Sequence, residues 1–268
     1  MKAHVAAIAG MALAVMPMPA RAGPPEAPFS GTYAGFNAGA AWGTSGYATD
    51  SGCAPSGINA VFCEAGASAI NGPAVANSGS GDLSTAGFTG GIQGGHNWQR
   101  GRIVYGGEAD FGAFDLGDSS AVNGTFPFTF LGDSYSLTNA VSTDWLATIR
   151  GRLGVAVRPE LLLYATGGVA FSDFEFSSAY SDNAIDSTFP GGTGTGRESG
   201  VRIGWVLGGG GEWLLDGPWS VKTEYLYTDF GSEDFAVPLS NTAAFTQTMR
   251  VKADLTAHIA RVGLNYRY

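Results

Sequence analysis

The residues RVGLNYRY, from Arg261 to Tyr268, alternate strictly between two kinds of side chain. One face of this segment carries the side chains of Val262, Leu264, Tyr266 and Tyr268, and the other carries Arg261, Gly263, Asn265 and Arg267. A period of two residues is typical of a strand with a different environment on each side. Such a strand leaves unpaired backbone groups at its edge unless another strand covers it. The segment therefore predicts a closed β-barrel in which the last strand pairs with the first.

The composition differs from that of an ordinary soluble domain. Of 268 residues, 42 are glycine, 12% are aromatic and only 14% are charged, whereas soluble domains contain about 25% charged residues. Beyond the N-terminal segment, the sequence has no run of about 18 consecutive apolar residues, the length that a membrane-spanning helix needs. Any membrane insertion of the mature chain must therefore use strands.

The first 22 residues have the layout of a secretory signal peptide. Lys2 precedes an apolar run over 5–18, and a small-residue site precedes Gly23. We expect cleavage between Ala22 and Gly23, which leaves a barrel domain over residues 23–268. Cleavage would leave 12 basic and 23 acidic residues, a formal charge of −11. This acidic balance argues against a nucleic-acid partner.

Eight segments of the mature chain alternate as membrane-spanning strands do. The predicted strands cover residues 31–42, 85–99, 102–113, 143–156, 161–172, 200–214, 219–230 and 250–268. The connections between them are alternately long and short: long ones over 43–84, 114–142, 173–199 and 231–249, and tight turns at 100–101, 158–160 and 216–218. Short turns in the periplasm and long loops outside are the usual arrangement. The pattern predicts an eight-stranded, antiparallel, up-and-down transmembrane barrel with both termini in the periplasm.

The tryptophans provide a test of this register, because amphipathic rings collect at the two membrane interfaces. All six lie on the apolar phase of their strands. At a climb of about 2.5 Å per residue, Trp98, Trp213 and Trp219 are expected within about 8 Å of the short turns, and Trp42, Trp145 and Trp205 about 25 to 30 Å above them. Together with Tyr266 and Tyr268, they predict one aromatic girdle at each interface. The core of a soluble sandwich has no reason to sort its tryptophans into two layers.

The opposite phase contains charged residues. Four acids and four bases are predicted to face the lumen: Glu108, Asp110, Glu212, Glu224, Arg150, Arg152, Lys222 and Arg261. The interior of an eight-stranded barrel is just wide enough for side chains to fill, so these charges must pair. We expect a charge-paired plug, with a narrow gated pore as the alternative.

The remaining candidate sites are few. Cys53 and Cys63 are expected to form one disulfide, although two free thiols remain the alternative. Two histidines of the mature chain, His96 and His258, are expected to lie in the aromatic girdles, and no catalytic, metal or cofactor site is predicted. The long loops are acidic, and loop aromatic residues such as Phe126 are available to pack together or to contact a host protein or another surface ligand.

Several motifs resemble a known family. The segments TYAGFNAG, GGIQGGHNWQ, EADF, RGRLG, LLYATGGVAF, GGGGEWLL, WSVKTEYLYTDFG and RVGLNYRY occur in order and look like those of the small outer-membrane barrels known as outer-membrane immunogenic or porin-family proteins. The resemblance implies a fold similar to the transmembrane domain of OmpA, with antigenic surface loops. It also implies that a terminal aromatic residue helps the barrel-assembly machinery recognise the last strand. Tyr268 stands where phenylalanine is commoner, and His96 where tyrosine is expected.

These observations favour a structural, surface-exposed barrel of the Gram-negative outer membrane, in contact with outer-membrane lipid and without catalysis. A low-conductance porin for small solutes is the first alternative. An adhesin or receptor that acts through its loops is the second.

Overall fold

The computed structural model describes residues 27–53, 68–127, 133–183, 191–241 and 246–268. The predicted signal peptide, with its cleavage site at Ala22 and Gly23, lies outside the described residues. Cys63 also lies outside them, so the disulfide between Cys53 and Cys63 stays a prediction.

Eight antiparallel strands form a single closed barrel, in which each strand pairs with the next and β8 pairs with β1. The strands are β1 (Gly31–Asp50), β2 (Gly81–Arg100), β3 (Ile103–Thr125), β4 (Ser134–Arg158), β5 (Leu161–Asp182), β6 (Gly192–Leu214), β7 (Trp219–Asn241) and β8 (Thr246–Arg267). Tyr33 pairs with Arg267 at one end of the closing seam, and Asp50 pairs with Arg250 at the other. The predicted eight-stranded, up-and-down architecture is confirmed.

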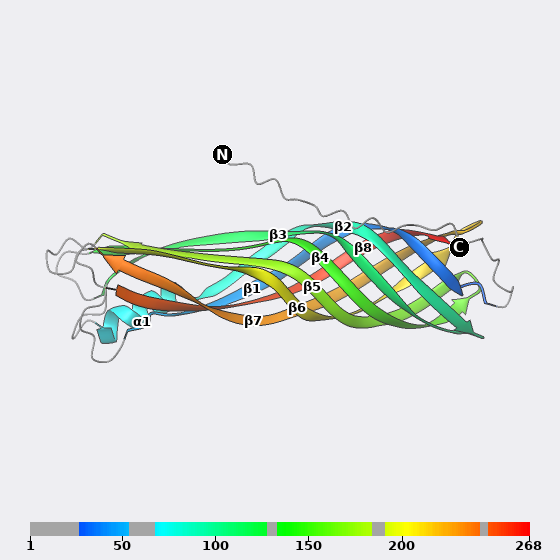
Figure 1. Cartoon of the computed structure of the whole chain (residues 1–268), viewed down its shortest axis with the longest axis horizontal. Helices are drawn as coiled ribbons and strands as arrows, with labels where there is room; N and C mark the ends of the chain where they lie inside the picture. Colours follow the sequence, from blue (N-terminus) through cyan, green and yellow to red (C-terminus); the bar gives the residue numbers. More distant parts are fainter. Residues whose placement is uncertain (1–26, 54–67, 128–132, 184–190, 242–245) are drawn as a thin grey trace.

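Three tight turns lie at one end of the barrel, where both ends of the described chain also lie (Figure 1). Gly101 and Gly217 occupy two of these turns with φ angles of 57° and 78°. Glycine adopts such left-handed conformations without the steric cost that a side chain would bring. These two residues therefore allow the chain to reverse tightly between β2 and β3 and between β6 and β7.

The strands are 20 to 25 residues long, about twice the 9 to 11 residues that cross a membrane. The long connections predicted over 43–84, 114–142, 173–199 and 231–249 are therefore wrong as loops, because the strands on either side continue well into all four. Figure 1 shows the result, a barrel much longer than it is wide. Most of the acidic residues assigned to loops, including Asp82, Asp118 and Glu175, belong to these strand extensions.

The extensions were missed because the alternation reverses phase along each strand. On β8, the buried residues are apolar between Met249 and Ile259, whereas Arg261 and Asn265 are buried nearer the short turns. Their outward neighbours change in the opposite sense, from the exposed Lys252 to apolar side chains such as those of Val262 and Leu264. A barrel wall in water hides its apolar face inside, and a wall in lipid presents it outside. The reversal thus separates a lipid-facing half, near the short turns, from a distal half.

One helix was not predicted from the sequence. Helix α1 (Ser68–Ser78) lies at the distal end of the barrel, where it contacts β1 and β3 (Figure 1). Its Val75 is fully buried in the distal core. The Tyr135 hydroxyl donates to the carbonyl of Ala74 at 3.2 Å and lies 2.8 Å from the Ser78 hydroxyl. Among the described residues, no helix has the length and hydropathy needed to cross a membrane.

Candidate functional site

The lumen of the lipid-facing half contains a cluster of buried charges, here called the charge network. Each of its side chains projects inward from β3, β4, β6, β7 or β8, and each residue is at most 8% exposed. The members are Glu108, Asp110, Arg150, Arg152, Glu212, Lys222, Glu224 and Arg261. The structure therefore brings together every residue that the sequence assigned to the lumen.

Glu108 is bound by side chains from three other strands. The Lys222 ammonium donates to both of its carboxylate oxygens, at 2.6 and 2.7 Å. Arg150 Nη2 donates to Oε1 at 2.5 Å, and the Tyr33 hydroxyl donates to Oε2 at 2.6 Å. Both oxygens of this buried carboxylate are thus satisfied, which offsets its loss of hydration.

Arg150 connects three carboxylates, because it also lies 2.8 Å from Asp110 and 3.2 Å from Glu224. Arg261 joins the same two carboxylates from β8, with Nη2 3.0 Å from Asp110 and 2.9 Å from Glu224. Its planar guanidinium suits such shared contacts better than an ammonium would. The network is therefore one continuous structure across the lumen and not a set of separate pairs.

Arg152 extends the network toward the short turns. Its Nη2 lies 2.8 Å from Glu212, and its guanidinium carbon lies 3.9 Å from the centre of the Tyr164 ring. Its Nη1 lies 3.7 Å from Glu108, so this contact is weaker than the one with Glu212. Arg152 Nη1 also donates to the Tyr33 hydroxyl at 2.9 Å. Tyr33 thus links Arg152 to Glu108.

Tyr33 was not recognised as part of the network from the sequence. The available signal was its phase, because it lies four residues before the inward-facing Asn37 on the same strand. Three amide side chains lie beside the charge network: Asn37 donates to Gln93 at 3.1 Å, and Gln93 donates to Asn265 at 2.6 Å. The polar filling therefore also reaches β1 and β2.

A second filling, which the sequence did not predict, occupies the distal half. Buried apolar side chains from all eight strands and α1 form one core, here called the apolar layer. Its aromatic residues include Tyr47, Phe114, Phe126, Tyr135, Phe174, Phe176, Tyr180 and Phe235. The Phe176 and Phe235 rings lie 5.2 Å apart, and Phe176 and Tyr47 lie 6.1 Å apart. Burial and the nearby Asp182 carboxylate raise the pKa of the Tyr180 phenol, so it remains a neutral hydrogen-bond donor there.

All six tryptophans face outward, in two groups. Trp98, Trp213 and Trp219 lie close to the short turns, and Trp42, Trp145 and Trp205 lie near the middle of their strands. The first group includes ring contacts of Trp98 with Tyr105 at 5.7 Å and of Trp219 with Tyr266 at 5.1 Å. Tyr266 also contacts Tyr268 at 5.3 Å. The second group includes contacts of Trp42 with His258 at 6.0 Å and of Trp205 with Tyr227 at 5.3 Å.

The histidines lie within these aromatic groups. His96 Nδ1 is 2.8 Å from the Thr32 hydroxyl, and the His96 ring is 4.5 Å from the Trp98 ring. His258 Nδ1 is 2.6 Å from the Tyr225 hydroxyl. A catalytic triad requires a carboxylate to orient the imidazole and a nucleophile on its other side. The neighbours of both imidazoles are instead hydroxyl groups and aromatic rings.

Comparison with known proteins identifies the family. Residues 5–268 match the family described as "Outer membrane protein beta-barrel domain". The 31 kDa outer-membrane immunogenic protein of Brucella melitensis is 32% identical over 198 residues, 71% of this chain and 70% of that protein. The 22 kDa outer membrane protein of Rhizobium leguminosarum is 32% identical over 58% of each chain. Among solved structures, OprG from Pseudomonas aeruginosa is 10% identical over 89% of this chain and 97% of that one, with a TM-score of 0.43.

The match to this family and the two sequence relatives agree with the resemblance in sequence and with the closed barrel. The relatives are outer-membrane proteins. The chain belongs to the outer membrane protein β-barrel domain family, and its place is the outer membrane of a Gram-negative bacterium.

Proposed function

We propose that this protein is a structural, surface-exposed barrel whose lumen is sealed and which performs no catalysis. In this arrangement the short turns and both termini lie in the periplasm, and the distal half rises above the membrane. The observation that carries the proposal is the charge network, which ties opposite walls of the lumen together.

The network supports a sealed lumen because its contacts cross between strands that are not neighbours. Arg150 on β4 reaches Glu224 on β7, and Arg152 on β4 reaches Glu212 on β6. Four basic residues face four acidic ones, so the cluster is formally neutral. A hydrated path through it would separate several buried ion pairs, and each separation leaves charges without partners.

The apolar layer supports the same conclusion independently. An ion that entered from the distal end would have to pass buried side chains such as Phe176, Leu239 and Val251, each fully or almost fully hidden from solvent. The apolar side chains of this layer cannot replace the ion's hydration shell. A low-conductance porin would therefore require both the charge network and the apolar layer to rearrange.

A second candidate function, adhesion or reception through the outer surface, is favoured by the long distal half. Its outward residues are largely polar, and exposed charges such as Glu233 and Lys252 lie on its wall. A relative of this chain is described as immunogenic, which fits a barrel whose distal part is accessible from outside the cell.

Single-channel recording in planar bilayers tests the proposal. The refolded mature protein is first checked for its unboiled gel shift, and Arg197→Ala, which changes only an exposed ion pair with Glu175, serves as the control variant. We expect no steady conductance from either protein. Steady conductance that changes when Glu108 is replaced by Gln would favour the porin and refute the sealed lumen. A silent barrel whose binding to a host-cell extract is lost when residues 184–190 are deleted would favour the adhesin.

A further inference from the structure

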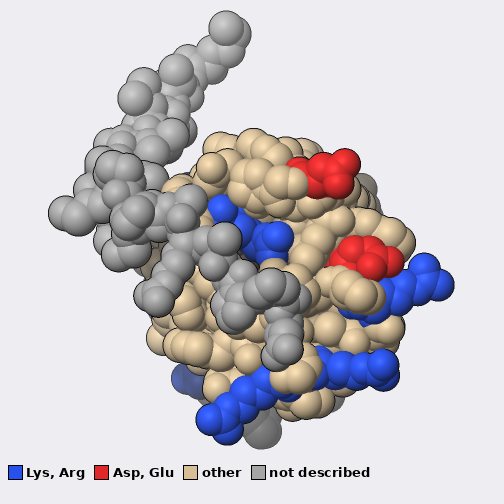
Figure 2. Space-filling model, turned by 90° about the vertical axis from the view of Figure 1, so that its right-hand side faces the viewer, with Lys and Arg blue, Asp and Glu red and all other residues tan. Residues whose placement is uncertain are grey.

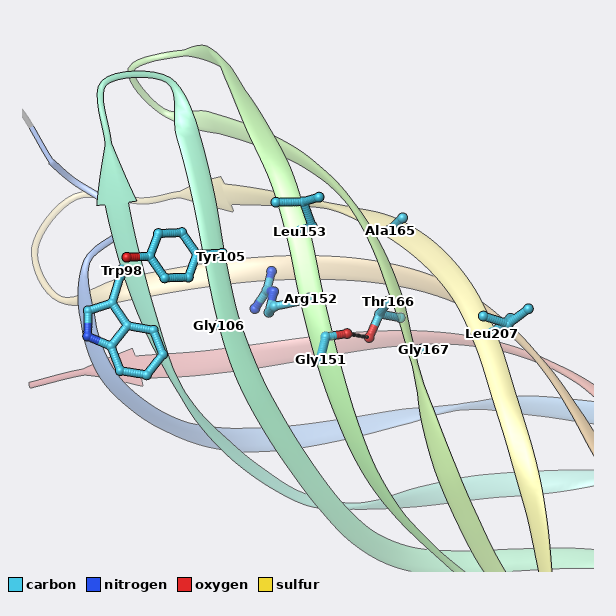
Figure 3. Close-up of a pocket in the computed structure, with 10 residues that line it drawn as sticks. All are labelled: Trp98, Tyr105, Gly106, Gly151, Arg152, Leu153, Ala165, Thr166, Gly167 and Leu207. Atoms are coloured by element: carbon cyan, nitrogen blue, oxygen red, sulfur yellow. Dashed lines mark hydrogen bonds between the residues drawn. The ribbon is translucent and has the colours of Figure 1, made fainter.

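A shallow groove marks the outer surface of the lipid-facing half. It has a volume of about 470 Å³ and crosses strands β2 to β6 (Figure 3). Trp98 and Tyr105 lie at one end of it, and Leu207 lies at the other. These three side chains are between 42% and 57% exposed, so they project from the wall into the space that lipid occupies.

The floor of the groove is made of glycine. Gly151 on β4 pairs with Gly167 on β5, and Gly167 pairs with Leu207 on β6, whose side chain covers Gly167. A Cβ atom on Gly151 would meet nothing closer than the Gly167 carbonyl oxygen at 3.9 Å, an ordinary contact. The packing of the barrel therefore does not require glycine at this position. The missing side chain instead leaves the outer surface hollow.

The walls of the groove are apolar and ordered by the strand register. Trp98, Tyr105, Leu153 and Ala165 form one continuous row across four strands. The Trp98 and Tyr105 rings stack at 5.7 Å with an angle of 22° between their planes. A shallow hollow with such walls, at the depth of the membrane, fits a flexible hydrocarbon chain.

Basic residues lie at the end of the strands that carry the groove. Arg100 follows Trp98 by two residues on the same face of β2, and Arg102 lies in the turn that follows. Arg158 ends β4, where the next turn begins. All three are exposed, and Figure 2 shows extended basic side chains along one side of this end of the barrel. The β4–β5 turn also carries Glu160, and the β6–β7 turn carries Asp216 and no basic residue.

We propose that the groove and these arginines form a binding site for an anionic diacyl phospholipid of the periplasmic leaflet. One acyl chain lies over Gly151 and beside Leu207, and the phosphodiester lies near Arg100, Arg102 and Arg158. Arginine is suited to the phosphate because its planar donors match the phosphate oxygens. The orientation of the lipid rests on the periplasmic position of the short turns proposed above, but its binding does not depend on whether the lumen conducts.

Quenching of Trp98 fluorescence by brominated lipid tests the site. The folded protein is placed in phosphatidylcholine nanodiscs that contain a small fraction of phosphatidylglycerol with brominated acyl chains, or the same fraction of brominated phosphatidylcholine. The signal of Trp98 is obtained as the difference between the wild type and Trp98→Phe. We expect the brominated phosphatidylglycerol to be preferred, by about fivefold for each arginine in contact with the phosphate.

Two kinds of variant separate the parts of the site. Gly151→Leu fills the groove and should abolish the preferential quenching, whereas Gly211→Leu is the matched control. Gly211 belongs to β6 but does not line the groove, and a Cβ there would meet the Leu163 Cδ2 at 3.5 Å. The double variant Arg100→Gln and Arg102→Gln should reduce the preference for phosphatidylglycerol toward that for phosphatidylcholine. An unboiled gel shift shows that each variant has folded.

Equal quenching by the two brominated lipids in the wild type would overturn the proposal. Preferential quenching that survives Gly151→Leu would overturn it as well, because the lipid would then lie elsewhere. The third overturning outcome is a change in oligomeric state on Gly151→Leu without any change in lipid preference, which would assign the groove to a second copy of the barrel.

Discussion

Replacing Arg150 by alanine tests whether the charge network holds the barrel together. The Arg150 side chain is fully buried, and it contacts Glu108, Asp110 and Glu224. Removal of one partner from a buried ion pair costs about 3 to 5 kcal/mol, because it leaves the other charge unpaired. Lys222 and Arg261 still contact these carboxylates in the variant. We therefore expect the free energy of unfolding to fall by about 3 kcal/mol, at the lower end of this range.

The assay is equilibrium unfolding in urea, followed by tryptophan fluorescence and by the unboiled gel shift. Arg197→Ala is the matched control, because the Arg197 side chain is 66% exposed and its partner Glu175 is 38% exposed. An exposed ion pair of this kind contributes at most about 1 kcal/mol. The urea midpoint of Arg150→Lys should lie between those of Arg150→Ala and Arg197→Ala, because lysine keeps the charge but lacks the planar guanidinium that reaches three carboxylates. An Arg150→Ala midpoint equal to that of Arg197→Ala would refute the reasoning.

Three further outcomes follow from other parts of the barrel. Phe176→Ala should destabilise the distal half by about 3 to 5 kcal/mol. Hydrogen exchange in the distal strands should then be faster. Unchanged exchange there would contradict an apolar layer built around this ring. Gly101→Ala should lower the free energy of unfolding by about 1 kcal/mol, because the φ of 57° at this turn strains an L side chain. Equilibrium unfolding in urea measures this loss. A variant more stable than the wild type would exclude the left-handed turn. Deletion of Tyr268 should slow assembly in cells while refolding in detergent remains normal, and normal assembly in cells would show that the barrel-assembly machinery does not need this residue.

The lipid-facing half could be predicted because lipid imposes a strict rule on its strands. Outward side chains must be apolar there, and a period of two then assigns every alternate residue to the lumen. The eight charged residues of the network were found in this way, and so was the outward position of the six tryptophans. The resemblance of the motifs to the family implied the same barrel fold.

The distal half escaped the same analysis for a physical reason. Where the wall leaves the lipid, water surrounds it on the outside. Apolar residues such as Met249 and Val251 therefore face the lumen there, whereas Arg261 and Asn265 face the lumen in the lipid-facing half. A search for one constant phase ends where the phase reverses. Glycine-rich and serine-rich stretches then look like loops, although the apolar residues within them still alternate with a period of two.

The sequence by itself determined the number of strands, the tight turns, the closing strand and the face on which each charge lies, because these depend only on local alternation. Only the tertiary structure decided which acid meets which base. Arg150 reaches Glu224 and Arg152 reaches Glu212 across the lumen, between strands that are not neighbours. Such contacts depend on the stagger with which the sheet closes, and that stagger is a property of the whole ring of strands. The same closure brings the separated apolar residues of eight strands into one layer, which no single segment of the sequence reveals.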